Sequence, residues 1–152
     1  MTAQTPEKPQ ATGTPENRGP ERVALEALAK IFQAEEKILV AYLFGSRAKG
    51  YATPESDYDI AVLLSETPRD LLDFYLRLLN KLTDTLGDNV DLVILNEAPP
   101  TLKYQVVKHG KPIYVKNERA RVAFESRTIR EYLDFSRILK RYDECLAKRL
   151  LQ

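Results

Sequence analysis

Three aspartates are the residues of this sequence best suited to chemistry. Asp57 and Asp59 stand two positions apart at the start of a hydrophobic run that continues to Leu64. Residues two apart on a strand share a face, which predicts α-carbons about 6 to 7 Å apart. Two ionised carboxylates so placed repel each other and lose hydration unless a cation compensates. Because the nearby ligand atoms are oxygens, without His or Cys, the pair indicates a hard ion, Mg²⁺ or Mn²⁺.

Asp91 is expected to join this pair. It opens another hydrophobic run, Asp91 to Leu95, after an amphipathic helix pattern over residues 67–87. A strand-helix-strand crossover makes the two strands parallel, so their starts lie side by side. A first strand, Ile38 to Phe44, ends in a Gly45-Ser46 turn. If this strand pairs antiparallel with the second, the turn reaches the same edge of the sheet.

The remaining patterns predict the scaffold. Thr67 is predicted as the N-cap of the crossover helix, with Pro68 in its first turn and Gly87 as its C-cap residue. Its apolar stripe is predicted to be Leu71, Leu72, Tyr75, Leu78, Leu79, Leu82 and Leu86. Other helices are expected over residues 20–36 and 102–108, and a short strand over 113–115. The sole histidine, His109, is interpreted as a helix-end residue rather than a catalytic one.

A helical arm is predicted over residues 116–152. It contains ten Lys or Arg and six Asp or Glu, a local balance of +4. A stripe of mostly apolar residues follows it: Ile129, Tyr132, Leu133, Phe135, Ser136, Leu139, Tyr142, Leu146 and Leu150. An unbroken helix would reach on the order of 50 Å, beyond the small sheet. Its distal half either binds a partner or folds back on its own core with a solvated basic face.

Composition restricts the class of protein. The chain has 152 residues, 43% of them hydrophobic, and a net charge of +1, which suits one compact domain with no field directed at nucleic acid or membrane. The single cysteine, Cys145, excludes an internal disulfide and is expected to be a small buried hydrophobe. Residues 1–19 are polar and proline-rich, which predicts a disordered tail. Without a long apolar run or signal peptide, a cytoplasmic protein is expected.

A resemblance adds to these predictions. Gly45-Ser46, ten intervening residues, Asp57-Tyr58-Asp59 and the later Asp91 resemble the signature of the polymerase-beta-like nucleotidyltransferases. Within that superfamily the chain is similar to the minimal nucleotidyltransferases of the MntA type, the antitoxin partners of HEPN ribonuclease toxins. The resemblance implies an α/β (α+β) nucleotidyltransferase core at residues 20–115, with a small mixed sheet packed by helices. The arm at 116–152 would then bind the partner.

The same resemblance implies a mechanism and a site. Asp57, Asp59 and Asp91 would hold two Mg²⁺ ions, with ATP as the nucleotide donor. Gly45 and Ser46 would contact the triphosphate; Arg47 and, less strongly, Lys49 are further candidates.

Three functions are compatible with these patterns. The first is transfer of AMP to a tyrosine of a HEPN toxin, in a hetero-oligomer with that toxin. The second is nucleotide transfer to a small hydroxyl compound such as an aminoglycoside, and the third is a non-enzymatic antitoxin. The three retained carboxylates argue against the third, because a binding module does not need them.

Overall fold

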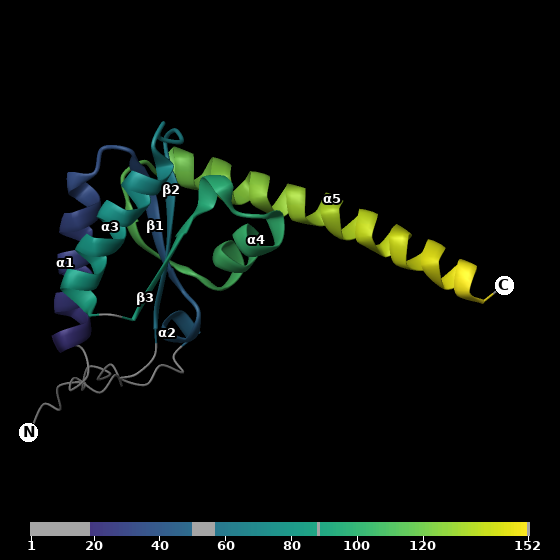
Figure 1. The fold of residues 1–152 in the computed structure, drawn as a ribbon, viewed down its shortest axis with the longest axis horizontal. Coiled ribbons are helices and arrows are strands. Elements are labelled where there is room, and N and C mark those ends of the chain that lie inside the picture. Colours follow the sequence, from purple (N-terminus) through teal and green to yellow (C-terminus); the bar gives the residue numbers. More distant parts are fainter. Residues whose placement is uncertain (1–18, 50–56, 88, 152) are drawn as a thin grey trace, which may run out of the picture.

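The computed structural model describes residues 19–49, 57–87 and 89–151 of the chain. It is an α/β fold with a helical arm, as predicted (Figure 1). The helices are α1 (Gly19–Ala34), α2 (Ser46–Lys49), α3 (Leu71–Leu86), α4 (Pro100–His109) and α5 (Glu118–Leu150), with a 3-10 turn, η2, at Leu95–Glu97. The strands are β1 (Ile38–Phe44), β2 (Tyr58–Leu64), β3 (Val90–Ile94) and β4 (Lys111–Val115). Residues 1–18 of the tail predicted at 1–19 lie outside the described residues, as does the loop at 50–56, and Gly19 begins α1 instead of ending the tail.

The strands form one mixed sheet in the order β3-β2-β1-β4. β2 and β3 are parallel, which confirms the crossover predicted from the sequence. β1 pairs antiparallel with both β2 and β4. The end of β1 therefore lies beside the starts of β2, β3 and β4, at one edge of the sheet.

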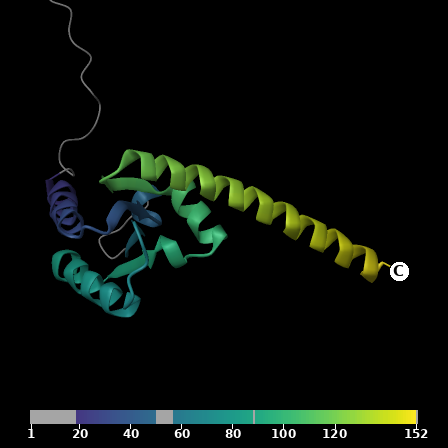
Figure 2. The same cartoon turned by 90° about the horizontal axis from the view of Figure 1, so that it is seen from above.

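Helices cover both faces of this sheet (Figures 1 and 2). On one face, α1 and α3 pack against the even-numbered residues of β2, such as Ile60 and Val62. On the other, α4 and the first part of α5 pack against the odd-numbered Ala61 and Leu63. The strict alternation of β2 between two buried clusters explains why it reads as a nearly continuous apolar run.

Helix α3 begins later than predicted. Its N-cap is Asp70, whose carboxylate accepts a hydrogen bond from the Asp73 amide at 3.0 Å. The prediction of Thr67 as the cap is wrong, because the Thr67 hydroxyl donates instead to the Glu97 carboxylate at 3.3 Å. The predicted C-cap residue is confirmed: Gly87 has a φ of 97° and its amide donates to Thr83 O at 2.8 Å.

The buried stripe of α3 also differs from the prediction. Phe74, absent from the predicted stripe, is buried with Leu78 and Leu82, whereas Leu72 is 67% exposed. The helix is rotated so that the positions four apart at 74, 78 and 82 face the sheet.

Other boundaries move by one or two residues. α4 begins at Pro100 rather than 102, because proline suits a first helical position whose amide has no partner. β3 begins at Val90 and β4 at Lys111, one and two residues earlier than predicted. The short helix α2 directly after Gly45 was not predicted.

Helix α5 is a single unbroken helix of 33 residues, capped by the Asn117 side chain, which accepts from Ala120 N at 3.1 Å. Only its first part packs on the domain, where Phe124 and Thr128 are buried. Beyond that part it extends away from the sheet, so the alternative that it folds back on its own core is wrong (Figures 1 and 2). Cys145 lies on the extended part and is exposed, contrary to the prediction of a buried hydrophobe.

Across the described ranges, the structure contains no helix with the length and apolar character needed to cross a membrane.

Candidate active site

The three aspartates predicted to act together lie at one edge of the sheet. Asp59 pairs with Asp91 across the parallel β2–β3 ladder and with Phe44 across the antiparallel β1–β2 ladder. The start of the parallel ladder is held by the Tyr58 amide, which donates to Asn89 O at 2.8 Å. Asp57 immediately precedes β2 and is exposed. The structure therefore brings together the carboxylates that the sequence pattern placed on adjoining strands.

The aspartates project from the α4/α5 face of the sheet. Asp59 alternates with Ile60 and shares its face with Ala61, which belongs to the cluster under α4 and α5. Its cross-strand partner Asp91 has the same orientation, because paired residues in a ladder share a face. Asp59 is half-buried and Asp91 exposed. The apolar face of the sheet thus ends in carboxylates that solvent can reach.

Gly45 lies directly against Asp59. It has a φ of 73°, and a Cβ built on it would lie 2.9 Å from Asp59 Cγ and closer still to Oδ2. Real Cβ atoms essentially never approach a neighbour this closely. Glycine is needed here twice, for a backbone conformation that side chains disfavour and for the room that the carboxylate occupies.

The negative charges of Asp91 and Asp57 make it unfavourable for Asp59 to ionise as well. Burial raises the pKa of the Asp59 carboxyl, and the charges of Asp91 and then Asp57 raise it further. Both neighbours act on Asp59, so the three groups form one electrostatic unit. A bound cation would reverse this penalty, because it favours the ionised forms of all three.

The carboxylates suit hard cations but do not enclose one. Throughout residues 19–49, 57–87 and 89–151, no group of three or more His, Cys, Asp or Glu side chains is arranged to hold a metal ion on its own. Mg²⁺ is commonly held by one or two carboxylates together with phosphate oxygens and water. Three carboxylates at a solvent-accessible edge, where the negative charges of Asp57 and Asp91 repel that of Asp59, fit that kind of binding.

The phosphate-binding candidates lie on or next to α2. Ser46 begins α2 directly after Gly45, and Lys49 ends it. Arg47 places its guanidinium over the Tyr58 ring, with Cζ 3.8 Å from the ring centroid. The sequence reasoning assigned no role to Tyr58; its position between Asp57 and Asp59 was the available signal.

His109 occupies the last turn of α4, where it was predicted. It is exposed, and α4 leads into β4 through Gly110. It remains a helix-end residue in this interpretation.

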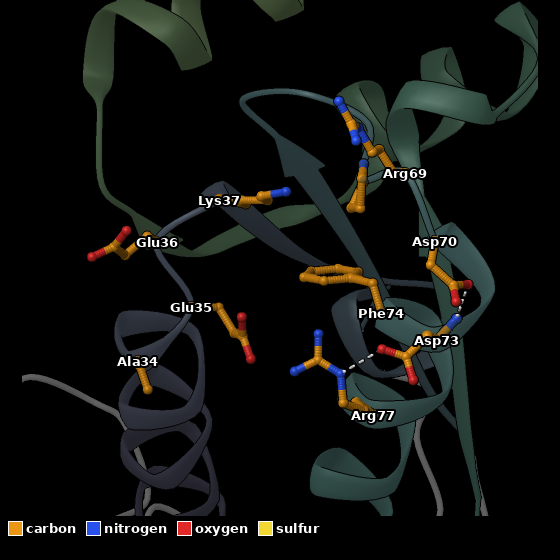
Figure 3. A pocket seen from close by; sticks show the side chains of 10 residues that line it. Ala34, Glu35, Glu36, Lys37, Arg69, Asp70, Asp73, Phe74 and Arg77 are labelled. Carbon is orange, nitrogen blue, oxygen red and sulfur yellow. Dashed lines mark hydrogen bonds and ion pairs between the residues drawn. The ribbon is translucent and has the colours of Figure 1, made fainter.

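A pocket lies at the opposite end of the sheet, between the end of α1 and the start of α3 (Figure 3). Its charged lining combines both signs, and Arg77 pairs with Asp73 at 3.0 Å. Lys37 in its wall directly precedes β1, whereas Gly45 directly follows β1, so a full strand separates this pocket from the aspartates. It contains none of the predicted site residues.

Comparison with known proteins gives a family. The family model described as polymerase beta, nucleotidyltransferase matches residues 26–119. The chain is 40% identical over 78 residues to the protein adenylyltransferase MntA of Shewanella oneidensis, a match that covers 51% of this chain and 55% of that protein. The chain thus spans little more than half the length of this relative.

Solved structures agree over more of the chain. A chain from a toxin-antitoxin complex with AMP-PNP superposes with a TM-score of 0.69 and 29% identity, covering 81% of this chain and 98% of that one. A chain from the complex of the tri-AMPylated HEPN toxin of Shewanella oneidensis with the MNT antitoxin has a TM-score of 0.66 and 26% identity, covering 84% and 98%. A chain from the MntA-HepT complex has a TM-score of 0.65 and 27% identity, covering 83% and 98%.

Proposed function

Because the chain belongs to the polymerase beta nucleotidyltransferase family, we propose that it transfers AMP from ATP to a tyrosine of a partner HEPN toxin and so neutralises that toxin. The relatives support this choice of donor and acceptor. The MntA relative is a protein adenylyltransferase, and a HEPN toxin solved with an MNT antitoxin carries AMP groups.

One observation carries the proposal. Burial, and then the charges of Asp91 and Asp57, raise the pKa of the half-buried Asp59, next to a glycine whose missing side chain makes room for the Asp59 carboxylate. Such an arrangement destabilises the ligand-free fold, because like charges oppose one another at the edge of an apolar sheet. It becomes favourable when cations and a nucleotide triphosphate bind there.

Each acidic residue has a proposed role. Asp57, Asp59 and Asp91 would hold two Mg²⁺ ions, which when bound neutralise the phosphate oxygens and align the acceptor with the leaving pyrophosphate. Asp91 can also accept the proton of the tyrosine hydroxyl, whose ordinary pKa of about 10 keeps it protonated near neutral pH. The tyrosine oxygen then bonds to the α-phosphorus as the bond to pyrophosphate breaks.

Binding of the donor would use the turn after β1. Because Gly45 has no side chain, the backbone of the turn can approach the triphosphate, and the Ser46 hydroxyl can donate to its oxygens. Arg47 adds a positive charge beside the same turn. These roles follow from the position of Gly45 and α2 beside the aspartates and from the resemblance to the polymerase-beta-like nucleotidyltransferases.

The distal part of α5 would bind the toxin. Its stripe, which includes Leu139, Tyr142 and Leu146, continues the face on which Phe124 is buried, yet these distal residues are 39% to 61% exposed. Large side chains exposed along one helical face usually mark an interface. A toxin seated on this stripe would lie beside α4, on the face of the sheet that carries the aspartates (Figure 2).

Mass spectrometry of the toxin tests the proposal. The HEPN partner is incubated with this protein, Mg²⁺ and each nucleoside triphosphate in turn, and its intact mass is measured. A gain of one or more adenylyl groups with ATP, absent when Asp59→Asn replaces the wild type, is the expected result. An unchanged toxin that is nevertheless bound and inhibited would establish the non-enzymatic antitoxin instead.

A pair of adjacent substitutions tests the arm. Leu146→Asp places a charge on the stripe, whereas Ala147→Asp makes the same change of charge about 100° around the exposed helix. Weaker toxin binding for the first variant alone, measured by calorimetry, is expected. Equal toxin binding by both variants would show that this stripe of α5 is not part of the interface.

A further inference from the structure

Tyr58, the first residue of β2, stands between Asp57 and Asp59 and points to the other side of the sheet from Asp59. Its ring packs at the margin of the α1/α3 cluster, whereas Asp59 shares its face with the α4/α5 cluster. The ring is only half-buried, in contrast to the next core positions of the same strand, Ile60 and Val62, which are fully buried. A tyrosine at this place therefore contributes less to the core than its size allows.

The Arg47 guanidinium lies over the Tyr58 ring. The guanidinium lies 3.8 Å from the ring centroid, within the range of a favourable cation–π contact. Arg47 belongs to α2, the single helical turn that follows Gly45, and α2 otherwise packs on the ends of β1 and β2. The contact thus joins the predicted phosphate-binding turn to the start of β2, between Asp57 and Asp59.

Stacking also suits an arginine that binds a ligand. The contact uses the face of the planar guanidinium and leaves the N–H donors in the plane, so a stacked arginine can still bind a phosphate oxygen. Holding the side chain against a ring lowers the entropy lost when a ligand is bound. The Tyr58 amide is itself held by Asn89 O at 2.8 Å, so the ring is carried by a strand fixed on both sides.

We propose that Tyr58 is a positioning residue of the nucleotide site: its ring holds the Arg47 guanidinium in place to bind the triphosphate and fixes α2 relative to Asp57 and Asp59. This inference rests on the proposed function, because it assumes that a nucleoside triphosphate binds at this edge. It adds a residue outside the Gly-Ser and Asp-x-Asp positions, and it assigns the α1/α3 face of β2 a part in binding.

A graded series of substitutions separates stacking from simple burial. The affinity for AMP-PNP with Mg²⁺ is measured by calorimetry, without the toxin, for Tyr58→Trp, Tyr58→Phe and Tyr58→Leu. Because a cation–π contact needs an aromatic face and is strongest with Trp, we expect Trp and Phe to retain the wild-type Kd within about twofold. Leu should raise it about three- to thirtyfold, since it fills space without a π-face. Equal values for Phe and Leu would overturn the proposal.

A double-mutant cycle tests the partner. Arg47→Met keeps much of the side-chain length and removes the charge; on this background Tyr58→Leu should change the Kd by less than about twofold. Additive losses would show that Tyr58 acts independently of Arg47 and would contradict the proposal. A thermal melt of every variant shows whether it folds. If Tyr58→Leu does not fold, the Tyr58→Trp and Tyr58→Phe variants are measured with Arg47 and with Arg47→Met instead. A ratio of their Kd values that is the same on both backgrounds would then contradict coupling between Tyr58 and Arg47.

The outcomes distinguish the two proposals. If the wild type does not bind AMP-PNP, the proposed function fails. If the wild type binds and the Tyr58 series is flat, only the positioning role of Tyr58 fails.

Discussion

Replacing Gly45 by alanine tests the arrangement of the active-site edge most directly. The added methyl would lie 2.9 Å from Asp59 Cγ and would overlap Oδ2, at a backbone φ of 73°. Ordinary contacts begin near 3.4 Å. The turn and the Asp59 carboxylate must therefore separate by about half an ångström at Cγ, and by more at the oxygen that would face a cation.

The expected losses of stability and of activity differ in size. A left-handed backbone costs alanine roughly 1 to 2 kcal/mol, and each kcal/mol lowers the Tm of a chain of about 150 residues by about 2 to 4 °C. The fold should survive this strain. Displacement of a catalytic group by about 1 Å can cost on the order of 100-fold in rate, so transfer should fall about 100-fold or more.

Gly87→Ala is the matched control. Gly87 has a φ of 97°, but a Cβ built there would meet no atom within 4 Å. It therefore carries comparable backbone strain without the collision, because its Cβ would touch neither Asp59 nor any other residue. A similar loss of Tm with an unchanged rate is expected.

Single-turnover transfer of AMP to the toxin, measured by intact mass at saturating ATP, gives the rates, and thermal melts give the stabilities. The reasoning is refuted if Gly45→Ala transfers AMP at the wild-type rate. It is equally refuted if Gly87→Ala loses as much rate as Gly45→Ala, because strain alone would then account for the effect.

Three further outcomes are expected. Asp59→Asn should abolish transfer yet raise the Tm of the ligand-free protein, because burial and the neighbouring charge of Asp91 both oppose the ionised form of Asp59. In thermal melts, added Mg²⁺ should raise the Tm of the wild type much more than that of the variant. Tyr42→Phe removes a hydroxyl that donates to Glu125 at 3.0 Å and should cost about 1.5 to 3 kcal/mol at neutral pH in urea unfolding. Because burial, and then Glu125, raises the pKa of Tyr42, the wild type should lose stability above about pH 10, where the unfolded tyrosine ionises, and the variant should lose less. Asn96→Ala removes two hydrogen bonds, 2.8 and 2.9 Å long, between the side-chain amide and the Leu64 backbone, and should lower the free energy of unfolding by about 1 to 3 kcal/mol; a loss below 0.5 kcal/mol, typical of exposed sites, would contradict this.

Local sequence patterns predicted that α3 exists and where it ends, but not its N-cap residue or its buried stripe. Thr67 and Asp70 are both suitable N-cap residues, and the sequence offers no means of choosing between them. The choice follows from a contact 30 residues along the chain, where the Thr67 hydroxyl meets Glu97. The same limit applies to Leu72 and Phe74, because the direction in which an apolar helix faces depends on the sheet beneath it.

The arm shows a related limit. Its helical period could be recognised in the sequence, but a stripe of apolar residues has the same pattern whether it is buried or exposed. Only the direction of α5 away from the sheet shows that Phe124 is buried and Leu146 is not.

Period-two alternation and a right-handed crossover belong to the chain itself, and for that reason the sequence alone determined that Asp57, Asp59 and Asp91 would meet at one edge of a mixed sheet. Tertiary structure alone decided that Gly45 makes room for the Asp59 carboxylate and that Arg47 stacks on Tyr58. These contacts join side chains of separate elements, whose directions depend on packing rather than on any spacing along the chain.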